Sequence, residues 1–347
     1  MKFGPVPIEQ AEGKILAHHI AGSNGNRALR KGKPLMAEDI AALHHLGRKM
    51  VYVAELEVGD VDEDMAASRV AQAVCGEHLS CTRAYVGRAN LHARRLGVLH
   101  IDLSRLEEFN GIEGLTLATL PTHTVVHAGQ MVATVKIIPF AVPESCVRKA
   151  EALASKGKAL LDLRILNERE VFLIFLGSAE AHPRVLQAFE PTLRTRVEAL
   201  GSRVKGVDYV AIQDDEQSEP GLAEALAKAM KSGAGLIVLA GETAIMDRRD
   251  RAPRAIERLG GEVIIFGAPV DPGNLLMVAY LGDTPVLGAP GCARSLKHNV
   301  IDEVLPRLLS GERLKRTDIS SMGHGGLLDS LPEGATWRLN QELTADE

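Results

Sequence analysis

The chain has 347 residues, of which 46% are apolar and only 3% aromatic, so it can form two domains with cores of Ala, Leu, Val and Ile. Its net charge of −5 leaves no basic surface for nucleic acid, and an anionic ligand would need local backbone dipoles and a few cations. The sequence contains no run of about 18 apolar residues, so we expect no membrane span. The start lacks the apolar run of a signal peptide, and the four cysteines form no CxxC pair, so we expect a cytoplasmic protein.

Residues 1–150 carry short helical and strand patterns, which predict a smaller region of mixed α/β structure. The spacing of Ile40, Leu43 and Leu46 predicts a helix over residues 37–47 that ends at a glycine. Further elements are expected as a strand at 51–55, a helix at 64–76 and β structure over 115–138. Prolines at 139 and 143 predict a linker, so we expect the domain boundary between residues 143 and 163.

Residues 163–318 alternate strand and helix patterns. Strands are expected at 171–176, 207–212, 236–239, 263–266, 277–281 and 285–287, and helices at 222–233 and 253–260. A last helix would carry its apolar face on Leu296, Val300, Val304 and Leu308, with Pro306 kinking or shortening it. This order predicts a three-layer α/β sandwich with a mostly parallel sheet, followed by a flexible tail over 319–347.

In such a sheet, ligands bind where loops leave the carboxyl ends of the strands. The first such loop follows the strand at 236–239. Gly241 would let an anion approach the backbone, Thr243 offers a hydroxyl, and the helix start near Pro253 offers free N–H groups. Asp250 would bind a ligand N–H or Mg²⁺. The alternative is an ordinary turn in which Asp250 caps the helix.

Two further loops fall on the same predicted edge. The turn Asp271-Pro272-Gly273 follows a strand, although such a turn is commonly only a turn. Residues 288–295 place glycines before a helix start, where backbone N–H groups and the charge of Arg294 could hold a phosphate. Three loops at one sheet edge favour a phosphate-bearing ligand over a purely structural role.

These motifs, AGET…DRRDRAP, PVDPGN and PVLGAPGCARS, resemble in order and spacing the molybdopterin-binding domain of molybdenum cofactor biosynthesis proteins. At the other end, VPIEQAEGKILAHHI and RKGKPLMAEDIAALHHLG are similar to molybdopterin molybdotransferases and to the molybdopterin-binding region of cofactor cytidylyltransferase fusions. The resemblance implies a molybdotransferase-like region over 1–150 and a molybdopterin-binding domain over 163–318. The cofactor-binding residues that it implies are Gly241, Glu242, Thr243, Asp250, Asp271, Pro272, Gly273, Gly288, Pro290, Gly291, Arg294 and Ser295.

The resemblance also implies a homo-oligomer that binds molybdopterin or its nucleotide form, with Mg²⁺ on Asp250 and molybdate as further components. Glu242 stands where the family has a glycine, and the Ser-Asp of many relatives is missing after Gly177. Three functions stay open: a transferase that inserts molybdate, a non-catalytic carrier that hands the cofactor to a molybdoenzyme or another biosynthesis protein, and a nucleotide pyrophosphatase. The sequence identifies no catalytic residue.

Overall fold

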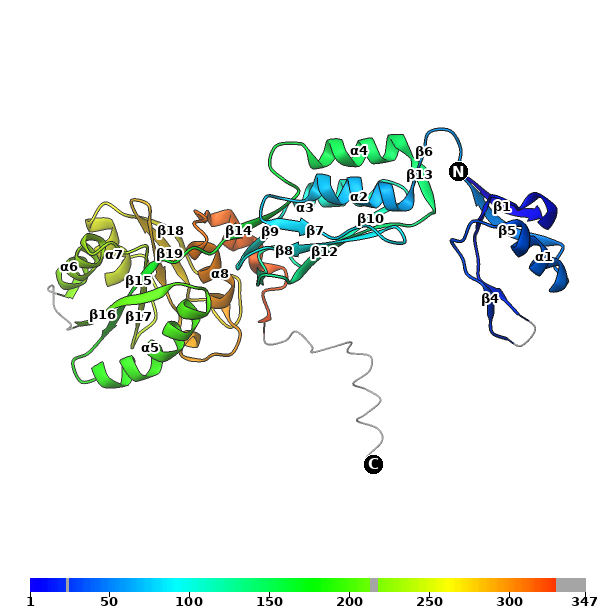
Figure 1. Cartoon of the computed structure of the whole chain (residues 1–347). Helices are drawn as coiled ribbons and strands as arrows, with labels where there is room; N and C mark the ends of the chain where they lie inside the picture. Colours follow the sequence, from blue (N-terminus) through cyan, green and yellow to red (C-terminus); the bar gives the residue numbers. More distant parts are fainter. Residues whose placement is uncertain (23–24, 213–217, 329–347) are drawn as a thin grey trace, which may run out of the picture. The chain divides into compact units, whose positions relative to one another are not determined.

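The computed structural model describes residues 1–22, 25–212 and 218–328. The chain divides into two compact units, Met1–Ile165 and Leu166–Glu347, and Figure 1 shows their elements in chain order. In the described part, no helix has the length and apolarity that crossing a membrane requires. The functional assignments of residues 1–150 and 163–318 stay predictions.

The first unit combines short helices with small antiparallel sheets. Its helices are η1 (Ile8–Gln10), α1 (Ala37–His45), α2 (Glu63–Val74), α3 (Leu103–Asn110) and α4 (Glu144–Ala154). Its strands are β1 (Lys2–Pro7), β2 (Ile15–Leu16), β3 (Ile20–Ala21), β4 (Arg27–Leu29), β5 (Met50–Glu55), β6 (Asp60–Asp62), β7 (Leu79–Cys81), β8 (Arg88–Ala93), β9 (Gly97–Ile101), β10 (Leu115–Thr119), β11 (Val125–Val126), β12 (Met131–Ile137), β13 (Ala141–Pro143) and β14 (Leu161–Ile165). They pair as β1-β5-β2, β10-β12-β8-β7, β11-β9-β14, β13-β6 and β3-β4.

The predicted helix at 64–76 is α2, and its boundaries have a local cause. Asp62 caps it, because its carboxylate accepts hydrogen bonds from the amides of Asp64 and Met65. The buried residues of α2 repeat with helical spacing and join the larger core of this unit. Figure 1 shows α4 beside α2, and Arg69 joins the two helices through ion pairs with Glu144 and Glu151.

The stretch at 139–143, predicted as a linker, contains strand β13, which pairs with β6. The chain then continues through α4 into β14, and β14 pairs with β9. Both pairings are antiparallel and lie inside the first unit. The first unit therefore ends at Ile165, after β14, and the second unit begins at Leu166.

The second unit is built on one six-stranded sheet. Its helices are α5 (His182–Ala199), α6 (Ser218–Lys231), α7 (Arg251–Arg258), η2 (Gly291–Arg294), α8 (Val300–Leu309), α9 (Arg316–Ser320) and η3 (Ser321–Gly323). Its strands are β15 (Glu170–Gly177), β16 (Arg203–Ala211), β17 (Leu236–Gly241), β18 (Glu262–Phe266), β19 (Met277–Leu281) and β20 (Thr284–Gly288), in the order β16-β15-β17-β20-β19-β18. All six strands predicted from the sequence are present.

The sheet is mixed, so the prediction of a mostly parallel sheet is not confirmed. β16, β15, β17 and β20 run parallel to one another, whereas β19 is antiparallel to both of its neighbours. The physical reason is connection length: β19 and β20 are joined by the turn Gly282-Asp283, and a turn this short can only join antiparallel strands. β18 again runs parallel to β20, because two antiparallel pairings separate them.

Helices cover both faces of this sheet (Figure 1). On one face, α6 and α7 bury Leu226 and Ile256 in one cluster with Ile174 of β15. On the other, Phe189 of α5 packs against Phe175, with ring centroids 6.4 Å apart. Ile174 and Phe175 are consecutive on one strand, so their side chains point to opposite faces.

The helix predictions need three corrections. α5 is absent from the sequence prediction, although its buried Val185, Phe189, Leu193 and Val197 repeat every fourth residue; Pro191 in its interior hides the pattern. α7 begins at Arg251 rather than at Pro253. α8 begins at Val300, leaving Leu296 outside and 61% exposed, because Asn299 caps it by accepting from the amide of Ile301. Pro306 lies inside α8, and α9 follows it.

The flexible tail was predicted over 319–347. Residues 329–347 lie outside the described residues. Before them, Ile319 is buried, and Gly326 and Leu328 hydrogen-bond through their backbones to Asp271 at 2.7 and 2.8 Å. The described part of this segment is therefore attached to the second unit.

Candidate functional site

The order of strands in the second unit defines one candidate edge for a ligand. From β15 the chain passes through α5 to β16 on one side, and then through α6 to β17 on the other side of β15. Connections that leave neighbouring strands in opposite directions open a crevice at the carboxyl ends of those strands. Here the connections diverge between β15, which ends at Gly177, and β17, which ends at Gly241. The three loops predicted from the sequence follow β17, β18 and β20, whose carboxyl ends lie at this same edge.

Glu242, which directly follows β17, binds the neighbouring turn at this edge. Its carboxylate accepts hydrogen bonds from the Ser178 amide at 3.1 Å and from the Ser178 hydroxyl at 3.2 Å, and its other oxygen accepts from Arg184. The amide of Ser178, followed by its hydroxyl and by Arg184, holds the pKa of Glu242 below its ordinary value. Glu242 thus uses the donors of the β15–α5 turn, which are of the kind that bind anions at a helix N-terminus.

Two further residues, Tyr209 of β16 and His182 of α5, contact the same turn or each other. The sequence analysis did not connect them with this turn. The Tyr209 hydroxyl donates to the Ser178 carbonyl oxygen at 2.6 Å, and the His182 ring lies 4.2 Å from the Tyr209 ring. Burial, and then the charge of Glu242, raises the pKa of Tyr209. The missed residues, which also include Ser178 and Arg184, carry no local motif, because each acts through a neighbour on another element.

The first predicted loop, residues 241–250, begins where two strands meet. A side chain at Gly241 would place its Cβ 2.6 Å from the carbonyl oxygen of Leu176, so only glycine fits there. Thr243 is exposed. Asp250 is the N-cap residue of α7 by backbone position, but it makes no capping bond to the helix. Its carboxylate instead accepts from the amides of Met246 and Asp247, at 2.6 and 2.9 Å, and so fixes the loop.

The third predicted loop touches the first one. A Cβ at Gly288 would lie 2.7 Å from Ile245 Cδ1, so the glycine allows the two loops to meet. Pro290 is buried and precedes the single turn of η2, at Gly291–Arg294. Arg294 folds back, because its Nε donates to the Gly291 carbonyl oxygen at 2.9 Å and its guanidinium lies 5.5 Å from the Phe189 ring centroid.

A buried arginine on α5 holds the third loop. Arg196 is only 6% exposed and binds both carboxylate oxygens of Asp302, at 2.8 and 3.1 Å. It also donates to the carbonyl oxygens of Ala293, Ser295 and Lys297. The hydroxyl of Ser295 accepts from the amide of Lys297. Arg196 is a positioning residue that no sequence motif revealed.

The second predicted loop is tied to α8. The Pro272 carbonyl oxygen accepts from the Val300 amide at 3.1 Å, and Gly273 lies so close to Val300 that a Cβ would clash with it. Asp271 is exposed, and its backbone binds Gly326 and Leu328. The structure therefore brings the β15–α5 turn, the first loop and the third loop into direct contact, whereas the second loop contacts the start of α8.

The described residues do not assemble a metal site around Asp250. Within residues 1–22, 25–212 and 218–328, no three His, Cys, Asp or Glu side chains form a group that could hold a metal ion. One oxygen of Asp250 already binds two loop amides. Mg²⁺ usually binds through one or two carboxylates together with waters and substrate phosphates. The described residues around Asp250 therefore form no complete metal site by themselves, and Mg²⁺ on Asp250 stays a prediction.

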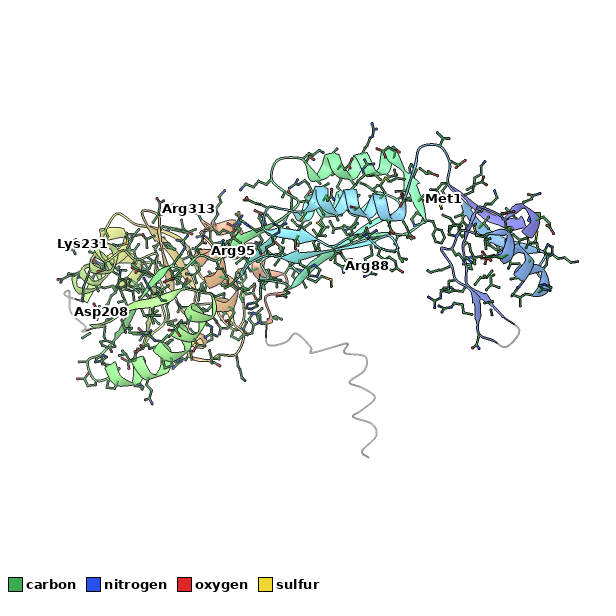
Figure 2. All side chains as sticks on the ribbon, in the orientation of Figure 1. Met1, Arg88, Arg95, Asp208, Lys231 and Arg313 are labelled. Carbon is green, nitrogen blue, oxygen red and sulfur yellow. The ribbon has the colours of Figure 1, made fainter. Side chains whose placement is uncertain are left out.

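Two cavities lie away from these loops. One of about 100 Å³ opens between β16 and α6, where Asp208 (labelled in Figure 2) pairs with Lys228 at 3.0 Å. The other, of about 280 Å³, belongs to the first unit and is lined by His100, Asp102, Arg105, Lys156, Lys158, Ala159 and Asp162. Neither cavity includes a residue of the three predicted loops.

Replacing the buried cation tests whether Arg196 holds the third loop. We expect Arg196→Ala to lower the free energy of unfolding by ~3–5 kcal/mol, because Asp302 and several carbonyls lose their buried partner. Arg194→Ala, on the same helix with a more exposed ion pair to Glu190, should cost about 1 kcal/mol or less. Urea unfolding of both variants measures this, and equal losses would contradict the role of Arg196.

The depressed pKa of Glu242 predicts a pH dependence. Because the pKa is lower in the folded state, the stabilisation is complete above the ordinary value of about 4.3 and disappears as the pH falls through the folded value. The difference in Tm between the wild type and Glu242→Gln should therefore be largest at neutral pH and shrink below about pH 4. Glu180→Gln, in the same turn and exposed, is the control; a pH-independent difference for Glu242→Gln would refute the assignment.

A family model described as "Domain of unknown function (DUF8806)" matches residues 5–55, less than half of the chain. No curated protein matches the chain.

Several solved structures are similar to the chain at low identity. A molybdenum cofactor biosynthesis protein from Pyrococcus furiosus is 12% identical with a TM-score of 0.24, over 90% of this chain and 64% of that protein. The molybdopterin biosynthesis moea protein from Pyrococcus horikosii is 16% identical with a TM-score of 0.29, over 89% and 75%. The tungsten cofactor synthesizing protein MoaB from Pyrococcus furiosus is 18% identical with a TM-score of 0.25, over 41% and 89%.

This chain thus spans about 64% of the length of the first of these proteins. Likenesses at these identities and TM-scores carry no argument about the activity of this chain.

Proposed function

We propose that the second unit binds molybdopterin or its nucleotide form at the carboxyl edge of its sheet and acts in molybdenum cofactor biosynthesis. One observation carries the proposal: the three sequence motifs that resemble a molybdopterin-binding domain follow β17, β18 and β20, whose carboxyl ends share one edge. That edge includes the point where the connections of β15 diverge, which is where ligands bind in such sheets.

The proposed site consists of residues that would contact the ligand and residues that shape the loops around them. Gly241, Thr243 and Gly291 would hold the phosphate end of the ligand, since two of them expose backbone and the third offers a hydroxyl. Asp250 would accept from an N–H group of the pterin, and Asp271 and Arg294 would flank the ligand. Glu242, Pro272, Gly273, Gly288, Pro290 and Ser295 shape the loops around them.

Glu242 favours a carrier over a molybdate-inserting transferase. Its carboxylate already uses the donors of the β15–α5 turn, and it adds a negative charge where a second anion would approach. Like charges repel most strongly where protein excludes water. A protein that holds molybdopterin and passes it to a molybdoenzyme or another biosynthesis protein needs only binding, for which backbone groups are sufficient. Mg²⁺, molybdate and a homo-oligomeric state stay predictions.

Titration of the full chain with molybdopterin tests the proposal. The bound pterin is quantified by its fluorescence after oxidation, following separation of the protein from free ligand. We expect stoichiometric binding, weakened about tenfold or more in Asp250→Ala, because a hydrogen bond to a charged group is lost. Asp283→Ala, in the exposed β19–β20 turn at the opposite edge of the sheet, should bind like the wild type.

Absence of binding to the wild type, with and without Mg²⁺, would reject the proposed function. Two other outcomes would show that the protein is an enzyme and not a carrier. Turnover that requires molybdate would identify a transferase, and release of a mononucleotide from a dinucleotide substrate would identify a pyrophosphatase on the same site.

A second variant tests the position of the phosphate end. Glu242→Ala frees the amide and hydroxyl of Ser178 and removes one negative charge, so molybdopterin should bind more tightly, by on the order of tenfold. Glu180→Ala, which removes an exposed carboxylate from the same turn, should change the affinity much less. Equal affinities of the wild type and Glu242→Ala would mean that the phosphate binds away from this turn.

A further inference from the structure

One cavity of the first unit, of about 280 Å³, lies between four segments of the chain. It is lined by residues of β9, of the start of α3, of the loop between α4 and β14, and of β14, elements that Figure 1 labels. Pockets that hold drug-sized ligands have volumes of about 300–1,000 Å³, so this cavity has room for a smaller metabolite. All of its lining residues belong to one compact unit.

Arg105 of α3 fixes one wall of this cavity. Its guanidinium donates to the carbonyl oxygens of Lys156 at 2.6 Å and of Lys158 at 2.8 Å, so the loop after α4 is wrapped around it. Its Nε binds the Asp102 carboxylate at 2.9 Å, and its amide donates to the same group. The amide and the side chain of Arg105 hold the pKa of Asp102 below its ordinary value. The charges of this pair cancel, and the backbone of the loop is held in place without a ligand.

Two ammonium groups remain on this loop. Lys156 and Lys158 both line the cavity, and both are exposed. In the part of the chain that the structure describes, neither ammonium group forms an ion pair or a hydrogen bond. Ammonium groups form strong, charge-assisted hydrogen bonds with phosphate oxygens. The fixed loop therefore offers two positive charges, two residues apart, to an anionic group in the cavity.

A second wall of the cavity carries a carboxylate beside an imidazole. Asp162 of β14 and His100 of β9 are direct partners in the antiparallel pairing of these strands, so their side chains project from the same face of the sheet. One Asp162 oxygen accepts from the Leu163 amide at 2.9 Å, and a carboxylate has acceptor positions for further donors. The His100 ring stacks on the His123 ring, with centroids 6.0 Å apart. This wall is suited to hydroxyl groups, which donate to a carboxylate and bond to either ring nitrogen.

We propose that this cavity binds a small sugar phosphate, with the phosphate on Lys156 and Lys158 and the sugar hydroxyls on Asp162 and His100. The two kinds of wall carry the assignment. Inorganic phosphate would leave the second wall unused and be repelled by Asp162, whereas a neutral sugar would leave both ammonium groups unused. The cavity shares no residue with the loops of the proposed molybdopterin site, so its test is independent of that proposal.

Calorimetric titration of the full chain with ribose 5-phosphate tests the site. Ribose and inorganic phosphate, titrated separately, present the two parts of this ligand. We expect one ribose 5-phosphate to bind per chain, and each part to bind at least about tenfold more weakly, because each part contacts only one wall. Asp250→Ala, which alters the proposed molybdopterin site, should leave the affinity for ribose 5-phosphate unchanged.

Two double variants locate the phosphate. Lys156→Gln/Lys158→Gln should weaken the binding of ribose 5-phosphate at least about tenfold, because both charges on the loop are lost. Lys149→Gln/Lys231→Gln removes the same charge from exposed positions on α4 and α6, outside the cavity, and should weaken binding less than about twofold at physiological salt. All four lysines are exposed, so both variants should keep the wild-type Tm.

Asp162→Asn locates the hydroxyls. It should weaken the binding of ribose 5-phosphate about fivefold or more, because a charged acceptor is lost, without weakening that of inorganic phosphate. The proposal would be overturned if ribose 5-phosphate failed to bind the wild type at millimolar concentration. Inorganic phosphate binding as tightly as ribose 5-phosphate would also overturn it, as would equal losses in the two double lysine variants.

Discussion

The second unit depends on the buried guanidinium of Arg196. An arginine cannot give up its proton in a protein, so wherever it is buried its charge and its donors must be satisfied. Asp302 balances the charge, and carbonyl oxygens of the loop after β20 accept from the remaining N–H groups. This network joins α5, α8 and the third loop, so none of them can shift without breaking it. A ligand site lined mainly by backbone requires such a frame, because backbone groups cannot adjust one by one as side chains can.

Glu242 determines which groups at this edge of the sheet are free to bind a ligand. The β15–α5 turn has the donors of an anion site, but an internal carboxylate already binds them and pairs with Arg184. An incoming phosphate gains at this turn only by exchange with Glu242. The third loop differs, because Arg196 holds its carbonyl oxygens and no carboxylate of the protein is bound to its amides among the hydrogen bonds described above. The proposed carrier role follows from this asymmetry, in which one part of the edge is occupied by the protein and another is left to the ligand.

Local patterns predicted much of the fold. The six strands of the second unit were predicted within a few residues, because continuous apolar runs bounded by glycines and prolines are local signals. Where the sequence prediction was wrong or incomplete, the causes were a proline inside a helix, a capping side chain and a short turn. Pro191 hid α5, whose apolar face is stable only against β15 and β16, and Asn299 moved the start of α8 past Leu296. The hairpin between β19 and β20 reversed one strand and made the sheet mixed.

By itself the sequence determined the six strands of the second unit, the motif-bearing loops and the edge of the sheet that those loops follow. Only the tertiary structure decided what the polar groups at that edge do. Glu242 binds Ser178 across 64 residues of chain, and Arg196 binds Asp302 across 106. Asp250 was predicted to face a ligand, yet its carboxylate also fixes the amides of its own loop. The physical reason is that apolar periodicity depends on neighbours along the chain, whereas a charged group takes whichever partner the fold brings within hydrogen-bonding distance.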